Sequence, residues 1–235
     1  MSEDRFDDLT TGEKLARRDE THPEPVRPPE VPRPGNKYAW LVGILMLMGL
    51  GVLLFAQTLP NKGEGLVGPE PGSRLRAFAA PSALGNLDGD ANVCQREPCP
   101  KQSGERPACA VVSEEVVNLC ELRERPLVLT FIFDRGADCY PQVDRTERVS
   151  ADVDGVNFAT LFFTGKEREE VRRLVESRGW RQPVAVDQDG AVANLYGVGG
   201  CPTTVFARPG GKVQATRLGN IAEDELRRRA ERLLR

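Results

Sequence analysis

The chain has 235 residues, six cysteines, a single histidine and a formal net charge of −3. The histidine, His22, lies in a polar N-terminal stretch, so the rest of the chain cannot form a Ser-His-Asp triad, a Cys-His pair or a histidine-ligated metal site. The near balance of opposite charges argues against a nucleic-acid partner. No cofactor and no metal site are predicted.

The N-terminal residues, 1–37, are rich in charge and proline and predict a disordered cytoplasmic tail. A segment of this composition cannot bury enough apolar surface to offset the conformational entropy that is lost on folding. A proline-rich docking site for a partner is an alternative role for the tail.

The next segment, residues 38–59, predicts a single transmembrane helix, because residues 38–61 carry no charged side chain. A spanning helix needs about 20 apolar residues to cross about 30 Å of hydrocarbon. Tyr38 and Trp40 stand at its start, where aromatic rings favour the membrane interface. A cleaved signal peptide is the alternative, but its shorter apolar core would lie closer to the N-terminus.

Lysine and arginine flank the predicted span almost evenly, so the cysteines decide the predicted orientation. All six cysteines follow the span, and they can oxidise to disulfides outside the cytoplasm. We therefore expect a single-pass protein of the cell membrane whose C-terminal domain lies outside the cytoplasm. Residues 60–73, rich in glycine and proline, predict a linker, and residues 74–235 predict the domain.

Residues 88–120 predict an insertion in this domain that holds four cysteines, namely Cys94, Cys99, Cys109 and Cys120. Two valine pairs around a Ser-Glu-Glu turn predict a β-hairpin over 109–120, with Cys109 opposite Cys120. That register favours the disulfides Cys109–Cys120 and Cys94–Cys99, while Cys94–Cys109 with Cys99–Cys120 stays open. Zinc binding is the competing interpretation, although the spacing lacks the close Cys-x2-Cys pairs of zinc sites.

The rest of the domain alternates strand and helix patterns. Near-continuous apolar runs predict buried strands over 127–133 and 156–163, and helices are predicted over 140–152 and 166–178. This order indicates a βαβ unit with a right-handed crossover. The later predicted elements are a strand at 183–186, a short helix at 191–196, a hairpin of strands 203–207 and 213–217, and a last helix opened by a capping box of Asn220 and Glu223.

Three segments resemble the membrane-anchored thioredoxin-like proteins of the redoxin type, which include the TlpA and ResA thiol-disulfide oxidoreductases. They are residues 127–142, residues 187–198 and, most specific, Tyr196-Gly-Val-Gly-Gly-Cys-Pro-Thr-Thr-Val-Phe206. The resemblance implies an α/β thioredoxin-like fold, a central mixed sheet flanked by helices, preceded by the single transmembrane helix. It also implies that Pro202 is a cis-proline whose loop faces the start of the helix at Cys139.

The chain departs from this family at the motif that carries the chemistry. Active members have Cys-x-x-Cys where the strand meets the helix, but here Gly136 replaces the first cysteine and Cys139 corresponds to the second. The resemblance places Cys201 close to Gly136, which leaves room for a Cys139–Cys201 bridge. We expect these two cysteines to be a relocated catalytic pair, supported by Pro202, Gly136 and Arg135, whose guanidinium would stabilise a thiolate.

Two functions are compatible with this pattern. The first is an extracytoplasmic thiol-disulfide oxidoreductase that acts on the thiols or disulfides of envelope proteins. The second is a redox-inactive module that binds a protein partner, with a structural Cys139–Cys201 bridge. Peroxidase activity is disfavoured because the Pro-x3-Thr-x2-Cys pattern is missing before Cys139, and the domain lacks the histidine of a copper chaperone.

Overall fold

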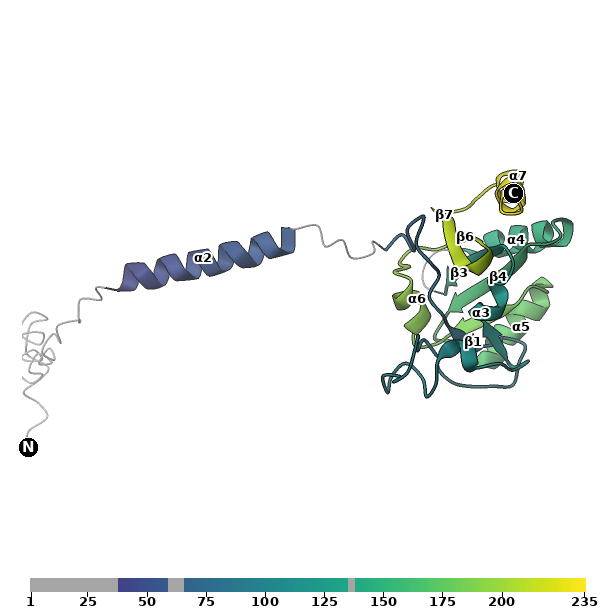
Figure 1. Ribbon diagram of the computed structural model, residues 1–235, viewed down its shortest axis with the longest axis horizontal. Coiled ribbons are helices and arrows are strands. Elements are labelled where there is room, and N and C mark those ends of the chain that lie inside the picture. The colour runs from purple at the N-terminus through teal and green to yellow at the C-terminus, as the bar shows by residue number, and fades with distance from the viewer. Residues whose placement is uncertain (1–37, 59–65, 135–137) are drawn as a thin grey trace, which may run out of the picture. The chain divides into compact units, whose positions relative to one another are not determined.

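The structure, a computed structural model, describes residues 38–58, 66–134 and 138–235. It divides into two compact units, residues 1–59 and 60–235. In the first unit, the helix α2 (Ala39–Thr58) covers most of the charge-free run (Figure 1). Among the described residues, no helix is both long enough and apolar enough to cross a membrane. The predicted tail, 1–37, lies outside the described residues, and the membrane anchor stays a prediction.

The second unit is built on a five-stranded mixed sheet with the strand order β5-β4-β3-β6-β7. These strands are β3 (Leu127–Phe133), β4 (Asn157–Phe163), β5 (Val184–Asp187), β6 (Thr203–Arg208) and β7 (Lys212–Leu218). The first three run parallel to one another, whereas β6 is antiparallel to β3 and β7 is antiparallel to β6.

The predicted βαβ unit is confirmed, because α4 (Tyr140–Asp152) joins β3 to β4 and α5 (Arg168–Arg178) joins β4 to β5. The predicted mixed sheet flanked by helices is confirmed as well. The other elements are β1 (Ala79–Pro81), β2 (Val116–Asn118), α3 (Leu119–Leu122), α6 (Ala191–Leu195), α7 (Glu223–Arg232) and two 3₁₀ turns, Ala108–Ala110 and Pro209–Gly211.

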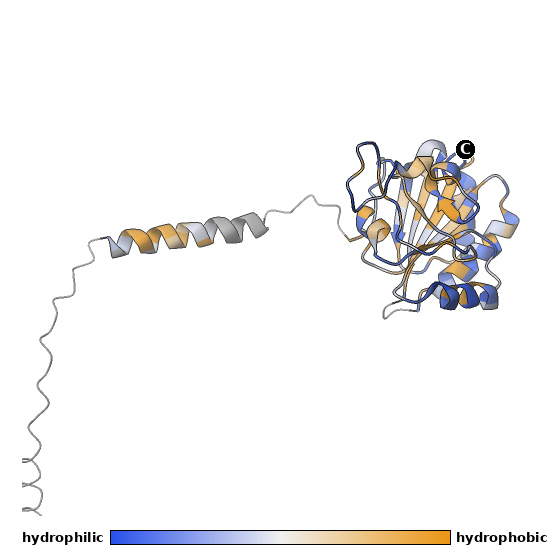
Figure 2. Ribbon diagram, turned by 90° about the horizontal axis from the view of Figure 1, so that it is seen from below, coloured by the Kyte–Doolittle hydropathy of each residue, from blue (hydrophilic) through white to orange (hydrophobic). Residues whose placement is uncertain are grey.

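The sheet is covered on both faces (Figure 1). Val128 and Ile132 of β3 face α4, α5 and α7, whereas Leu129 and Phe131 face α3, α6 and the strand pair β1–β2. Figure 2 shows the hydrophobic residues gathered in the sheet and hydrophilic residues on the outer helices. A strand that is buried on both faces has an apolar residue at nearly every position, which explains why the sequence predicted β3 and β4 so closely.

The predicted hairpin over 109–120 is wrong. Its second half forms β2, which pairs antiparallel with β1 from earlier in the chain, and its first half begins in a 3₁₀ turn. The buried side chain of Asn118 explains the difference. Its Nδ2 donates to the carbonyl oxygens of Ala108 and Val111 at 3.0 and 2.7 Å. The segment therefore folds around one amide group rather than pairing with itself.

The predicted capping box of the last helix is also wrong. The N-cap of α7 is Ala222, and no side chain caps this end. Asn220 instead accepts a hydrogen bond from Arg145 at 2.9 Å, and Glu223 pairs with Arg148 at 2.9 Å. Asn220 precedes α7 and Glu223 is its first residue, so the two contacts join the start of α7 to α4 through charge-assisted hydrogen bonds from arginine.

Candidate functional site

Cys139 lies where the loop after β3 enters α4. It is the N-cap residue of this helix, and Pro141 occupies the first turn, where a backbone N–H is not needed for the helix ladder. The backbone N–H of Tyr140 donates to Oδ1 of Asp138 at 3.3 Å. The side chain of Cys139 is only 1% exposed and packs in a cluster with Ile132.

Cys201 reaches the same place from the loop before β6. The peptide bond between Cys201 and Pro202 is cis, which is the isomer that the resemblance implied. The backbone N–H of Phe133, the last residue of β3, donates to Sγ of Cys201 at 3.2 Å. Gly200 lies directly against the side chain of Leu218 in β7, so the loop runs close to the edge of the sheet.

A disulfide joins Cys139 to Cys201, and their Cα atoms lie 5.9 Å apart. The two sulfur-bearing residues differ in access, because Cys139 is buried and Cys201 is only half-buried. An incoming thiolate can therefore reach the disulfide at Cys201 and not at Cys139. If the bond opens there, the negative charge is released at Cys139, where the start of α4 favours it through the helix macrodipole.

A polar network fixes the first turn of α4 beside this disulfide. The Tyr140 hydroxyl donates to Oδ1 of Asp134 at 3.0 Å, and the Thr164 hydroxyl donates to Oδ2 at 3.2 Å. The Lys166 ammonium lies 3.6 Å from the same carboxylate, and the Arg178 guanidinium lies 4.9 Å from the centre of the tyrosine ring. Burial, aided by the bond to Asp134, raises the pKa of Tyr140, so its hydroxyl stays a donor.

Two exposed apolar side chains flank the loop that carries Cys201. Leu66, 73% exposed, lies against Gly199, and Leu218, 54% exposed, lies against Gly200. Exposed apolar side chains next to a reachable sulfur are suited to bind an apolar segment of another protein.

The remaining predicted site residues have different outcomes. Arg135 and Gly136 lie outside the described residues, so their supporting roles stay predictions. Pro202 is buried next to Cys201. The other four cysteines form two disulfides, Cys94–Cys99 and Cys109–Cys120. Their sulfurs are therefore not available to zinc, and no metal-binding group of three or more His, Cys, Asp or Glu occurs within the described part of the chain.

Two features of the site were not predicted from the sequence. The donor from Phe133 is a backbone group, and nothing in the identity of that residue reveals it. The burial of Cys139 had a readable signal, because Val143 and Thr146 follow it at helical spacing and are both fully buried. That periodicity could have indicated that Cys201 is the accessible partner.

No protein-family model matches the chain, and a search of curated proteins finds no match. Solved structures do match. A Chlorobium tepidum protein, assigned as the thiol:disulfide interchange protein DsbE, is 18% identical, with a TM-score of 0.52 over 70% of this chain and 98% of its own. A secreted thiol-disulfide isomerase from Corynebacterium glutamicum is 13% identical, with a TM-score of 0.52 over 74% of this chain and 94% of its own.

A third similar structure is the thioredoxin domain of a thiol-disulfide oxidoreductase from Bacteroides vulgatus. It is 15% identical, with a TM-score of 0.51 over 71% of this chain and 99% of its own. Together with the strand order of the sheet, these similarities show a thioredoxin-like fold. Because identities this low establish the fold alone, the chemistry has to be argued from the site.

Proposed function

We propose that the protein is a membrane-anchored thiol-disulfide oxidoreductase that works outside the cytoplasm and exchanges disulfides with other proteins through Cys139 and Cys201. The disulfide between the N-cap of α4 and the cis-proline loop is the observation that carries this proposal. The fold supports it, because similar structures include a secreted thiol-disulfide isomerase.

The first step of the proposed reaction is attack by a thiolate of the partner on Sγ of Cys201. A bond forms between the two sulfurs, the Cys139–Cys201 bond breaks, and Cys139 leaves as a thiolate at the start of α4. The second thiol of the partner, once deprotonated, then attacks the partner's own sulfur in this mixed disulfide. Cys201 leaves as a thiolate, and the partner has lost two electrons and gained a disulfide.

The described contacts suit each leaving group. The thiolate at Cys201 would keep the N–H of Phe133 as a hydrogen-bond donor at 3.2 Å. The thiolate at Cys139 would lie at the positive end of a helix that runs from Tyr140 to Asp152. The reverse reaction, in which reduced Cys201 attacks a partner disulfide, uses the same groups in the opposite order.

The anchoring part of the proposal rests on the charge-free residues 38–61, and the extracytoplasmic part rests on the cysteines. All six cysteines are bonded in disulfides, which persist in oxidising compartments. Cell fractionation followed by protease treatment of intact cells tests both parts. We expect the chain in the membrane fraction and residues 74–235 to be cleaved from outside; recovery in the soluble fraction would contradict anchoring.

The second candidate function is a redox-inactive module that binds a partner. The burial of Cys139, only 1% exposed, favours this candidate, because a buried sulfur in an apolar cluster also suits a permanent bridge. The exposed side chains of Leu66 and Leu218 would then form part of the binding surface.

Capture of mixed disulfides separates the two candidates. In Cys139→Ser, the accessible Cys201 attacks a disulfide of the partner protein. Because the thiol of Cys139 is missing, the mixed disulfide is not resolved, and we expect covalent complexes that reductant separates. In Cys201→Ser, the remaining thiol is buried, so we expect at least tenfold fewer complexes. The matched control is Cys94→Ser with Cys99→Ser. Equal capture by both single variants would contradict the assignment of Cys201 as the accessible sulfur, and capture by neither would contradict the oxidoreductase proposal.

A further inference from the structure

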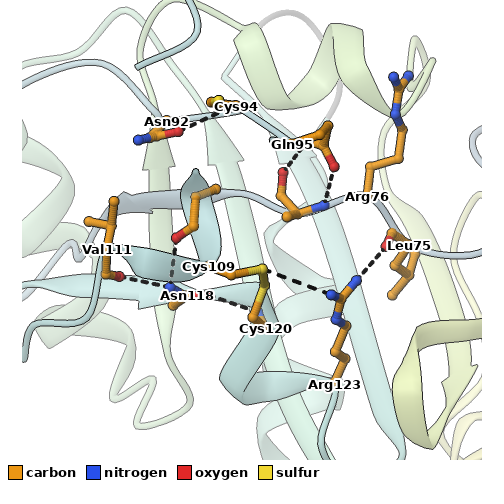
Figure 3. Close-up of a disulfide and its surroundings, with 12 residues drawn as sticks. Leu75, Arg76, Asn92, Cys94, Gln95, Cys109, Val111, Asn118, Cys120 and Arg123 are labelled. Carbon is orange, nitrogen blue, oxygen red and sulfur yellow. Dashed lines mark hydrogen bonds between the residues drawn. A yellow bond between two sulfur atoms is a disulfide. The ribbon is translucent and has the colours of Figure 1, made fainter. Parts of the chain in front are cut away.

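A second disulfide, Cys109–Cys120, lies at the surface and faces a positive charge (Figure 3). Cys109 is exposed and Cys120 is half-buried. Figure 3 shows Arg123 pointing to this disulfide, and its Nη2 donates to Sγ of Cys109 at 3.9 Å. The Nη1 of the same side chain donates to the carbonyl oxygen of Leu75 at 2.8 Å. This second bond holds the guanidinium against the sulfur.

The guanidinium matters because thiolates, and not thiols, attack and leave in disulfide exchange. A neighbouring arginine lowers the pKa of a thiol and so stabilises its thiolate. The disulfide Cys94–Cys99, in the same part of the chain, has the opposite surroundings. Cys99 is half-buried, Cys94 is only 1% exposed, and neither is as open as Cys109. The Sγ of Cys94 lies 3.4 Å from the carbonyl oxygen of Arg96, whose partial negative charge disfavours a thiolate.

The backbone around Cys109 and Cys120 is held by a group that does not depend on the disulfide. Asn118, 3% exposed, donates to the carbonyl oxygen of Ala108, the residue before Cys109. Its Oδ1 accepts the backbone N–H of Cys120 at 2.8 Å. One amide therefore fixes both chain segments, and the two thiols of a reduced protein would remain close enough to form the bond again.

We propose that Cys109–Cys120 is a second thiol-disulfide exchange site, which accepts two electrons from a protein dithiol. A thiolate of that dithiol attacks Sγ of exposed Cys109, and Cys120 leaves as a thiolate that takes a proton from water. The second thiolate of the dithiol attacks its own sulfur in the mixed disulfide, and Cys109 leaves as a thiolate beside Arg123. The dithiol has become a disulfide, and Cys109 and Cys120 are reduced.

This site is independent of the Cys139–Cys201 site in its contacts and in its proposed chemistry. Arg123 and Asn118 hold this site, whereas the backbone N–H of Phe133 contacts Cys201. The accessible sulfur here therefore meets a full charge instead of a backbone N–H. A protein with an inert Cys139–Cys201 bridge could still exchange disulfides here.

Timed reduction of the oxidised full chain tests the proposal, with dithiothreitol as the dithiol. Samples are quenched with acid and alkylated, and mass mapping follows each cysteine pair separately, so failure at Cys139–Cys201 does not affect the result. We expect Cys109–Cys120 to open at least about tenfold faster than Cys94–Cys99, because the attacked sulfur of Cys109 is exposed and the neighbouring guanidinium attracts the incoming thiolate. Equal rates would overturn the proposal.

Substitution of Arg123 separates its charge from plain exposure. We expect Arg123→Gln to slow the opening of Cys109–Cys120 about tenfold and Arg123→Lys, which keeps the charge, to slow it less than about threefold. The rate at Cys94–Cys99 is the internal control for folding and should not change. An unchanged rate in Arg123→Gln would overturn the role of the guanidinium.

Capture of a mixed disulfide is a second test of the proposal and needs no rate measurement. In Cys120→Ser, Cys109 remains as the exposed thiol, and we expect it to form a mixed disulfide with a model peptide disulfide. In Cys109→Ser, the half-buried Cys120 should form at least about tenfold less. Equal capture by the two variants would contradict the assignment of Cys109 as the accessible sulfur of this pair.

Discussion

The two disulfides proposed as exchange sites are built in opposite ways. At Cys139–Cys201 one sulfur is buried at a helix start and the other meets a backbone N–H. At Cys109–Cys120 the accessible sulfur is exposed and meets the guanidinium of Arg123. The first arrangement selects by access, because only Cys201 can be reached. The second selects by charge, because a cation attracts and stabilises thiolates.

The two proposed exchange sites depend on different parts of the domain. The first depends on the sheet, since β3 supplies the donor to Cys201 and α4 supplies Cys139. The second depends on a short irregular segment held by Asn118. Changes to the sheet should therefore affect the first site, and changes to this segment should affect the second.

The largest expected effect is the loss of stability when each bridge is removed. Chain-entropy arguments give about 4 kcal/mol for Cys139→Ala with Cys201→Ala, whose cysteines are 62 residues apart, and about 3 kcal/mol for Cys109→Ala with Cys120→Ala, 11 residues apart. Denaturant unfolding of the isolated domain and both variants measures this. A larger loss of stability on removing Cys109–Cys120 than on removing Cys139–Cys201 would contradict this prediction.

The next effect is a pH dependence of the free energy of unfolding. It is caused by a buried carboxyl group at the end of the sheet that lies near Cys201. Asp187 ends β5 fully buried, and burial raises its pKa to about 6 although two backbone N–H groups donate to it. Because this pKa lies above the unfolded value, the stabilising contribution is complete below about pH 4 and is lost as the pH rises to about 6.

We therefore expect the free energy of unfolding to contain a contribution that falls by up to about 3 kcal/mol between about pH 4 and pH 6. Asp187→Asn should remove this contribution, and Arg123→Gln, which changes the other site, should leave it in place. Urea unfolding across this range is the measurement. Parallel pH profiles for the wild type and Asp187→Asn would show that Asp187 does not cause the slope.

A smaller effect is expected at Asn118, which holds the second site. Asn118→Ala leaves the carbonyl oxygens of Ala108 and Val111 without this partner and should cost about 2 kcal/mol. It should also slow the closing of reduced Cys109–Cys120 while closing of Cys139–Cys201 keeps its rate. Unfolding and timed reoxidation with mass mapping test both statements. Equal slowing at the two sites would indicate a general loss of structure.

The smallest expected effect is a difference in salt dependence. Raising the ionic strength from about 0.05 to about 0.5 M should slow the attack of an anionic thiolate on Cys109 about two- to threefold, because the charge of Arg123 is screened. Attack on Cys201, whose described donor is a neutral N–H group, should change less. The rate of reduction by glutathione is measured for both disulfides at the two salt concentrations. Equal salt dependence would contradict the electrostatic difference between Cys109 and Cys201.

Much of the sheet could be predicted from the sequence, and much of the segment before it could not. The strands β3 and β4 can be predicted from the sequence because burial on both faces makes almost every residue apolar. The pairing of β1 with β2 has no such signal, since β1 is only Ala79–Pro81 and its partner lies far along the chain. The wrong hairpin over 109–120 results from that long-range pairing and from the side chain of Asn118.

The candidate sites divide in the same way. Proximity of Cys139 to Cys201, which are 62 residues apart, was implied by the family resemblance around Pro202 and not by spacing. The contact of Arg123 with Cys109 could not be predicted, because it depends on how the short helix α3 turns this side chain back toward the 3₁₀ turn that carries the cysteine.

The reduction potential of Cys139–Cys201 decides whether this disulfide takes part in redox exchange. The oxidised domain is equilibrated in dithiol redox buffers, alkylated and mapped by mass, so that each pair titrates separately. The proposal predicts a midpoint for Cys139–Cys201 above about −300 mV, within the range of exchanging disulfides. A midpoint well below about −300 mV would identify a structural bridge and contradict the oxidoreductase function.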